Sequence, residues 1–163
     1  MNPPAPLQFE TSLMLAAPQT AVFHALADHA HFCDFVPGMS RVLVDSSHAC
    51  QPNGVGTIRT CYFGNDMLLE ERIVLWQPPF SYGYSATAPN PFGLWNHLAV
   101  MECHPLQTQT KLIWKQYFEH DDLPAMLRLM HQTFDGVIGE IYGRFVMDSR
   151  LVDQANLNSL IHK

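Results

Sequence analysis

Residues 110–147, TKLIWKQYFEHDDLPAMLRLMHQTFDGVIGEIYGRFVM, pass from the period of a β-strand to the period of a helix. From Thr110 to Phe118 the residues alternate, with Trp114 and Gln116 on one face. A helix is then predicted to begin after Asp121 and Asp122, whose carboxylates suit a helix N-terminus, and to run to about Met147. Its apolar residues recur three or four apart: Leu127, Met130, Phe134, Val137, Ile138, Ile141 and Phe145. Such a stripe must be buried, and a sheet is the surface available to bury it.

Upstream of this stretch, residues 40–118 form short runs rich in β-branched and aromatic residues, separated by turn residues. The spacing is typical of antiparallel strands joined by hairpins, with GND, QPP, PNPFG and HPLQ among the breaks. The six predicted strands are Arg41–Ser46, Val55–Phe63, Met67–Gln77, Phe80–Ala88, Leu94–Cys103 and Thr110–Phe118.

The N-terminal part predicts one more strand and two short helices. Residues 1–6 form a proline-rich tail, and Leu7–Leu15 alternates as a strand does. Pro18 suits the first position of a helix that runs to Asp28, and residues 29–35 suit a second short helix. The fold class is therefore α+β: a curved seven-stranded antiparallel sheet wrapped around a long C-terminal helix. One domain is expected over residues 7–149, with a loose tail over 150–163.

The amino-acid composition and net charge argue against several classes of function. The chain has 163 residues, of which 47% are hydrophobic and 15% charged, so it can bury one substantial core. Its net charge of −6 and the absence of a basic run argue against a nucleic-acid partner. We expect no integral membrane segment, no secretory leader and a cytoplasmic location. Four scattered cysteines and nine histidines without ligand spacing predict neither disulfides nor a metal site, and no cofactor is implied.

This order of elements resembles the helix-grip fold of the SRPBCC superfamily, which includes START-like and birch-pollen-allergen-like proteins. APQTAVFHALADHAHFCDFVPGM (residues 17–39) is similar to its opening segment. GVGTIRT (54–60), ERIVLWQPPFSYGY (71–84) and KLIWKQYFE (111–119) look like its polyketide cyclase/dehydrase branch. The resemblance implies a deep apolar cavity between the sheet and the long helix. It leaves function open, because the superfamily includes lipid carriers, hormone receptors, cyclases and coenzyme-Q chaperones.

One hairpin carries the strongest candidate residues. A three-residue loop of Gly64, Asn65 and Asp66 would place Arg59 opposite Glu71, whereas a two-residue loop would select Glu70. The resemblance implies that Arg59 points into the cavity, with Glu71 as its partner. There Arg59 could donate to a ligand oxygen and Glu71 could orient it or act as a general base. The alternative is a cross-strand ion pair with a purely structural role.

Further candidates lie on neighbouring strands and on the helices. Pairs two residues apart share a face: Tyr82 with Tyr84, Trp95 with His97, and Trp114 with Gln116. Aromatic faces with a few polar tips suit a pocket for a flat or apolar ligand, and equally suit a core. His97 is either an acid/base group or a satisfied interior histidine. The other residues expected to contact a ligand or border the cavity mouth are Phe32, Phe35, Met39, Phe92, Met126, Met130 and Phe134.

These observations favour the binding or transport of a lipophilic or aromatic small molecule. The alternative is an enzyme similar to polyketide cyclases or aromatases, using Arg59, Glu71 and His97. A third possibility is a partner-binding module whose cavity is incidental. Separately, Gly136, Gly139 and Gly143 fall on one helix stripe nearly opposite the apolar one, which predicts a homodimer contact through that face.

Overall fold

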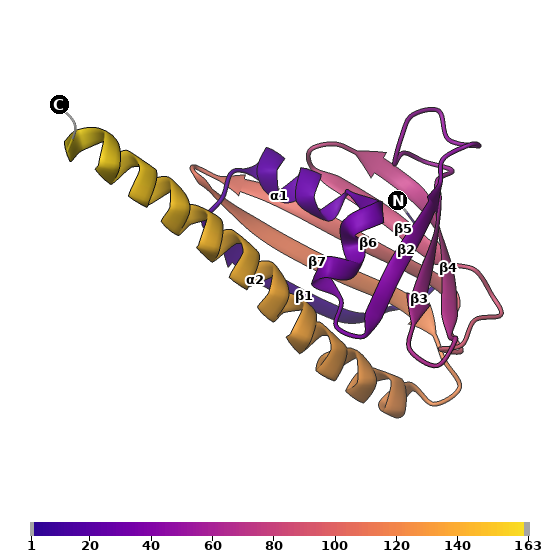
Figure 1. The fold of residues 1–163 in the computed structure, drawn as a ribbon. Helices are drawn as coiled ribbons and strands as arrows, with labels where there is room; N and C mark the ends of the chain where they lie inside the picture. The colour runs from indigo at the N-terminus through magenta and orange to yellow at the C-terminus, as the bar shows by residue number, and fades with distance from the viewer. Residues whose placement is uncertain (1, 162–163) are drawn as a thin grey trace.

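The computed structural model describes the backbone of residues 2–161 and the side chains of residues 2–146. Seven antiparallel strands form one curved sheet in the order β1-β7-β6-β5-β4-β3-β2, and a long helix, α2, lies across its concave side (Figure 1). The elements are β1 (Leu7–Leu15), α1 (Gln19–Leu26), the 3₁₀ helix η1 (His29–Phe35), β2 (Met39–Asp45), β3 (Ile58–Phe63), β4 (Leu68–Gln77), β5 (Ser81–Ala86), β6 (Trp95–Leu106), β7 (Gln109–Glu119) and α2 (Leu123–Ile161). The α+β helix-grip architecture is therefore confirmed.

Several boundaries differ from the predicted ones by a few residues, and two of the differences have a plain physical reason. β3 begins at Ile58 and not at Val55, because the chain is still turning at Gly56, where φ is 95°. The helix predicted to end near Met147 continues to Ile161, so the backbone of the expected loose tail is helical. The end of the helix was placed where its apolar stripe ends. A helix can continue past its apolar stripe when no helix-breaking residue follows. The sequence contains neither glycine nor proline after Gly143.

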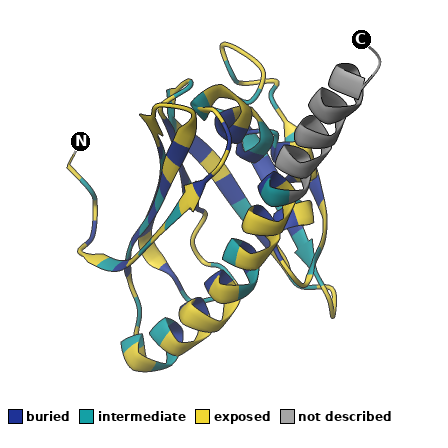
Figure 2. Ribbon diagram, turned by 90° about the vertical axis from the view of Figure 1, so that its left-hand side faces the viewer, coloured by how far each residue is buried: buried dark blue, intermediate teal, exposed yellow. Residues whose placement is uncertain are grey.

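The apolar stripe of α2 forms one side of the core. Val137, Ile141 and Phe145 are at most 4% exposed, and Figure 2 shows the buried positions of α2 on its side toward the sheet. Phe134 packs edge-on against Trp114 of β7, with ring centroids 4.9 Å apart. Burial of such side chains contributes roughly 1.5–3 kcal/mol each, so this stripe holds α2 on the sheet.

The β3–β4 hairpin has the three-residue loop. Arg59 pairs with Glu71 across the two strands. Asn65 and Asp66 adopt left-handed φ values of 65° and 57°, which the short polar side chains of such residues tolerate. The face that carries Arg59, Cys61, Glu71 and Ile73 is buried toward the helix, while the opposite face is exposed or half-buried. The three-residue register and the buried face are thus confirmed.

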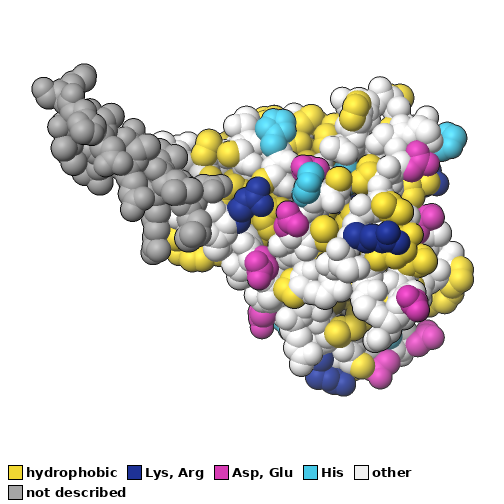
Figure 3. Space-filling view, viewed as in Figure 1, with side chains coloured by type: hydrophobic (Ala, Val, Ile, Leu, Met, Phe, Trp, Pro, Cys, Tyr) yellow, Lys and Arg dark blue, Asp and Glu magenta, His cyan; other side chains and the backbone are white. Residues whose placement is uncertain are grey.

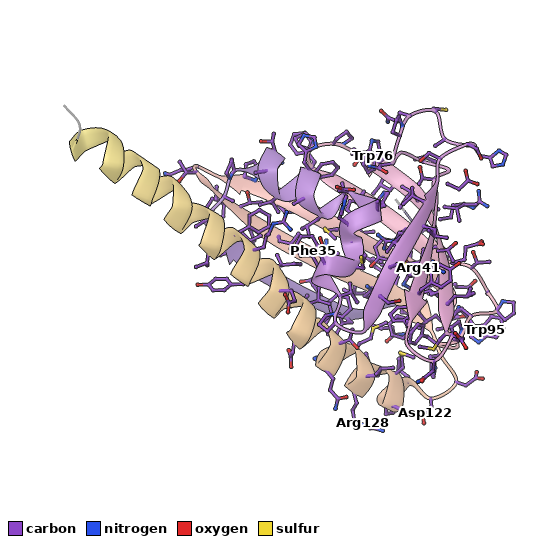
Figure 4. The ribbon with its side chains drawn as sticks, viewed as in Figure 1. Phe35, Arg41, Trp76, Trp95, Asp122 and Arg128 are labelled. Atoms are coloured by element: carbon purple, nitrogen blue, oxygen red, sulfur yellow. The ribbon has the colours of Figure 1, made fainter. Side chains whose placement is uncertain are left out.

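Two bulges change the facing of tryptophans. A register shift between Ile73 and Leu75 turns Trp76 inward, where its ring centroid lies 5.4 Å from that of Phe23. A second shift, between Trp95 and Leu98, leaves Trp95 46% exposed, so the prediction that Trp95 shares a face with His97 is wrong. Figure 4 shows these two tryptophans well apart, Trp76 near the top of the view and Trp95 at its lower right. A bulge inserts one residue and breaks the alternation on which the prediction rested.

The glycines of α2 do not share one environment. A Cβ at Gly136 would lie 3.0 Å from Cγ of Pro37, so Gly136 allows the loop after η1 to approach the helix. A Cβ at Gly139 or Gly143 would meet nothing within 4 Å. One glycine of the predicted dimer face is thus explained within the chain. On the face shown in Figure 3, described Lys and Arg side chains lie apart from one another among hydrophobic and uncharged atoms.

Among the described residues, no helix combines the length and the apolar character needed to span a membrane.

Candidate functional site

A cavity of about 240 Å³ lies between the concave face of the sheet and α2. Its walls come from the segment around η1, the β3–β4 hairpin, the loop before β6, the centres of β5, β6 and β7, and the first half of α2. The polar side chains in the lining are Glu71, Tyr84, His97, Trp114, Gln116 and Thr133. The apolar ones are Phe32, Val36, Pro37, Met39, Phe63, Met67, Leu69, Phe92, Leu94, Met126, Leu129, Met130, Phe134 and Val137.

Glu71 is held at the cavity wall by its neighbours on β3. Its Oε2 accepts a hydrogen bond from Nε of Arg59 at 2.5 Å and one from Sγ of Cys61 at 3.6 Å. The cross-strand register places all three side chains on the buried face. Burial, followed by the Glu71 charge, raises the pKa of the Cys61 thiol above its ordinary range, so Cys61 is a neutral donor.

Arg59 is completely buried behind Glu71 and does not line the cavity. Its guanidinium carbon lies 4.1 Å from the ring centroid of Phe32 and 4.1 Å from that of Tyr84. Burial by itself lowers the pKa of Arg59, but the Glu71 carboxylate together with Tyr82, Tyr84 and Cys61 raises it by more, and the guanidinium stays charged. Neither Nη1 nor Nη2 has a hydrogen-bond partner among the described residues. The two rings thus separate this cation from the cavity.

A second layer of buried polar groups surrounds Arg59 away from the cavity. The hydroxyl of Tyr82 donates to the backbone oxygen of Leu26 at 2.8 Å, and burial raises its pKa. Nε2 of His29 donates to the backbone oxygen of Asn53 at 3.1 Å. Burial, then the Arg59 charge, lowers the pKa of His29 to about 3, so this imidazole is neutral. These groups serve the core and not the cavity.

His97 has no free lone pair to offer a ligand. Its Nδ1 accepts the backbone N–H of Ala86 at 2.8 Å, so the ring proton sits on Nε2, which donates to Oε1 of Gln116 at 2.8 Å. Burial lowers the pKa of His97 despite the Gln116 hydrogen bond. His97 is therefore a neutral residue with both ring nitrogens hydrogen-bonded within the protein.

The indole of Trp114 is 2% exposed and packs against Phe134 and Phe32. Its Nε1–H has no acceptor within the described part of the chain. A buried donor without a partner costs free energy, which an acceptor on a bound molecule would recover. Tyr84 remains a neutral hydroxyl, because burial raises its pKa.

The residues singled out from the sequence divide into two groups. Those in the cavity lining are Phe32, Met39, Glu71, Tyr84, Phe92, His97, Trp114, Gln116, Met126, Met130 and Phe134. Those outside the lining are Arg59, Tyr82 and Phe35. Tyr82 lies two residues before Tyr84 on β5, and its hydroxyl contacts the end of α1. Phe35 lies next to α2, where the Arg144 guanidinium is 5.6 Å from its ring centroid. Figure 4 shows Phe35 between η1 and the helix.

Several lining residues were not predicted. Phe63 and Met67 flank the GND loop, and Leu94 precedes β6. Phe92, from the loop before β6, was among the predicted residues. Its ring packs edge-on against that of Phe63, with the centroids 5.5 Å apart. Alternation along each strand could not identify the others, because the start of α2 brings these strand ends together. The described residues contain no group of three or more His, Cys, Asp or Glu side chains arranged to hold a metal ion.

Comparison with solved structures shows the same fold in proteins of low sequence identity. XoxI from Bacillus cereus matches with 14% identity and a TM-score of 0.72, over 85% of this chain and 94% of that one. The ZhuI aromatase/cyclase from Streptomyces sp. R1128 matches with 17% identity and a TM-score of 0.66, over 83% and 91%. Norcoclaurine synthase from Thalictrum flavum, solved with dopamine and hydroxybenzaldehyde, matches with 12% identity and a TM-score of 0.64, over 88% and 89%.

No curated protein matches the chain. The family model described as polyketide cyclase/dehydrase and lipid transport matches residues 6–145, which is nearly the whole sheet and the described side chains of α2. The helix-grip fold, the apolar cavity and this match agree. The chain therefore belongs to the polyketide cyclase/dehydrase and lipid transport family of the SRPBCC superfamily.

Proposed function

We propose that this protein binds or carries a small lipophilic or aromatic molecule in the cavity between the sheet and α2. The observation that carries the proposal is the cavity itself, about 240 Å³ and lined mainly by aromatic, methionine and aliphatic side chains. Sites for small molecules are concave, mostly apolar and equipped with a few polar groups that orient the ligand. Methionines such as Met126 and Met130 add surface that adapts to ligand shape.

Binding without chemistry is favoured because two of the three candidate catalytic groups are already occupied. His97 uses both ring nitrogens within the protein, so it cannot accept a proton without losing a hydrogen bond. Arg59 is covered by Phe32 and Tyr84. In this arrangement His97 lines the cavity without a free lone pair, and Arg59 does not line the cavity.

The cyclase-like alternative rests on Glu71 alone. Its carboxylate lines the cavity, so it could accept a proton from a substrate while Arg59 holds it from behind. The match to an aromatase/cyclase of the same fold is a reason to test this alternative, although identity of 17% supports the fold only. A single carboxylate can accept a proton and return it, so this alternative is limited to proton transfers through one group.

The test combines ligand detection with a blocked cavity. Native mass spectrometry of the purified protein should detect a bound apolar molecule, and the neutral fluorophore N-phenyl-1-naphthylamine should bind. Thr133→Trp would fill the cavity, since Thr133 lines it. Gln132→Trp, at the neighbouring exposed position of α2, is the matched control. Loss of fluorophore binding in Thr133→Trp alone supports the proposal, and equal binding by both variants would exclude this cavity as the binding site.

A further inference from the structure

The charge of the cavity wall comes from one side chain. Among the described residues that line the cavity, Glu71 is the single charged group, and it is 6% exposed. Its Oε2 is occupied by Arg59 and Cys61, whereas no described residue donates a hydrogen bond to Oε1. A carboxylate oxygen in a largely apolar cavity gains from a donor on a bound molecule.

The balancing positive charge is out of reach of a ligand. Arg59 does not line the cavity, and Phe32 and Tyr84 cover its guanidinium. A ligand carboxylate would therefore meet the Glu71 charge first and find no guanidinium N–H to bind. Coulomb energy falls with distance, so the nearer like charge outweighs the farther opposite charge. The cavity therefore disfavours anionic ligands, even though the Arg59–Glu71 ion pair as a whole carries no net charge.

One lining residue also carries a buried donor that lacks an acceptor. Nε1–H of Trp114 is buried and has no acceptor in the described part of the chain. The side-chain amide of Gln116 lies on the same wall, with its Oε1 occupied by His97. A hydroxyl group both donates and accepts, so one ligand hydroxyl can satisfy an acceptor such as Glu71 and a donor such as Trp114.

We propose that the ligand is a neutral molecule bearing a hydroxyl group, an alcohol or a phenol, whose O–H donates to Glu71, and that the cavity rejects carboxylate ligands such as fatty acids. This inference rests on the proposed binding function and specifies the chemistry of the same cavity. It differs from the sequence expectation, in which Arg59 would have bound a ligand oxygen.

A matched ligand series tests the proposal on the unaltered protein. 2-Naphthol, 2-methoxynaphthalene and 2-naphthoate share one skeleton, and each would compete with N-phenyl-1-naphthylamine at pH 7. We expect 2-naphthol to bind about tenfold or more tightly than the ether, because the ether lacks the donor for a charged acceptor. We expect 2-naphthoate, which is ionised at this pH, to bind more weakly than either.

Variants then assign the selectivity to one carboxylate. Glu71→Gln should reduce the preference for 2-naphthol over 2-naphthoate. Glu70→Gln should leave it unchanged, since Glu70 lies on the opposite face of β4 and accepts a hydrogen bond from Thr87 Oγ1. If Glu71→Gln does not fold, the ligand series on the wild type still decides. If 2-naphthoate binds more tightly than 2-naphthol, or all three compounds bind equally, this inference is overturned while the proposed binding function stands. Failure of the fluorophore itself to bind would overturn both.

Discussion

Replacing Arg59 by methionine should destabilise the protein more than any substitution of an exposed arginine. Arg59 is completely buried and its ion-pair partner Glu71 is 8% exposed in its side chain. Methionine keeps the apolar contacts with Phe32 and Tyr84 but leaves the Glu71 carboxylate buried without a counter-charge. Breaking a buried pair in this way costs about 3–5 kcal/mol. For a chain of this size the melting temperature should fall by about 6 to 20 °C.

Arg41→Met is the matched control. The Arg41 guanidinium lies 4.1 Å from the ring centroid of Tyr62, yet on the exposed face of the sheet, where such a contact contributes about 0.5–1 kcal/mol. Urea unfolding gives the free energy of unfolding of each variant. An m-value equal to that of the wild type shows that the substitution changed stability and not the surface exposed on unfolding. Combining Arg59→Met with Glu71→Met should restore most of the loss, because an apolar replacement of both charges is often neutral. Equal costs for Arg59→Met and Arg41→Met would refute the argument.

Three further predictions concern other parts of the molecule. The lowered pKa of His29, about 3 in the fold against 6.5 for the free side chain, means that the unfolded chain binds a proton which the folded chain does not. The free energy of unfolding should therefore fall by up to about 5 kcal/mol as the pH drops from 6.5 toward 3, and urea titrations across this range should show a smaller slope in His29→Phe. Gly139→Ala should raise the unfolding free energy by about 1 kcal/mol, because a Cβ there meets nothing within 4 Å. Gly136→Ala should gain less in the same assay, since Pro37 must move. Finally, if the chain forms the predicted homodimer through this helix face, light scattering should show a dimer that Gly139→Leu converts to monomer; a wild-type monomer would contradict the prediction.

The sequence alone determined the order of elements, whereas the facing of the central hairpin was expected only from the family resemblance. Alternation in the strands and the stripe at helical spacing are local properties, because each follows from which residues must be buried. The GND loop left two registers open, because loop length determines whether Glu71 or Glu70 is selected, and the structure has the one that pairs Arg59 with Glu71.

The tertiary structure decided which of these buried residues a ligand can reach. Arg59 and Glu71 face the same side, but Phe32 from η1 and Tyr84 from β5 cover the cation and leave the carboxylate at the wall. The bulge that turns Trp95 outward is likewise invisible in the local pattern. These outcomes depend on how elements distant in the sequence fill the same space. The repeat of apolar residues specifies that a side chain is buried, whereas the neighbours it meets there are specified only when sheet and helices pack together.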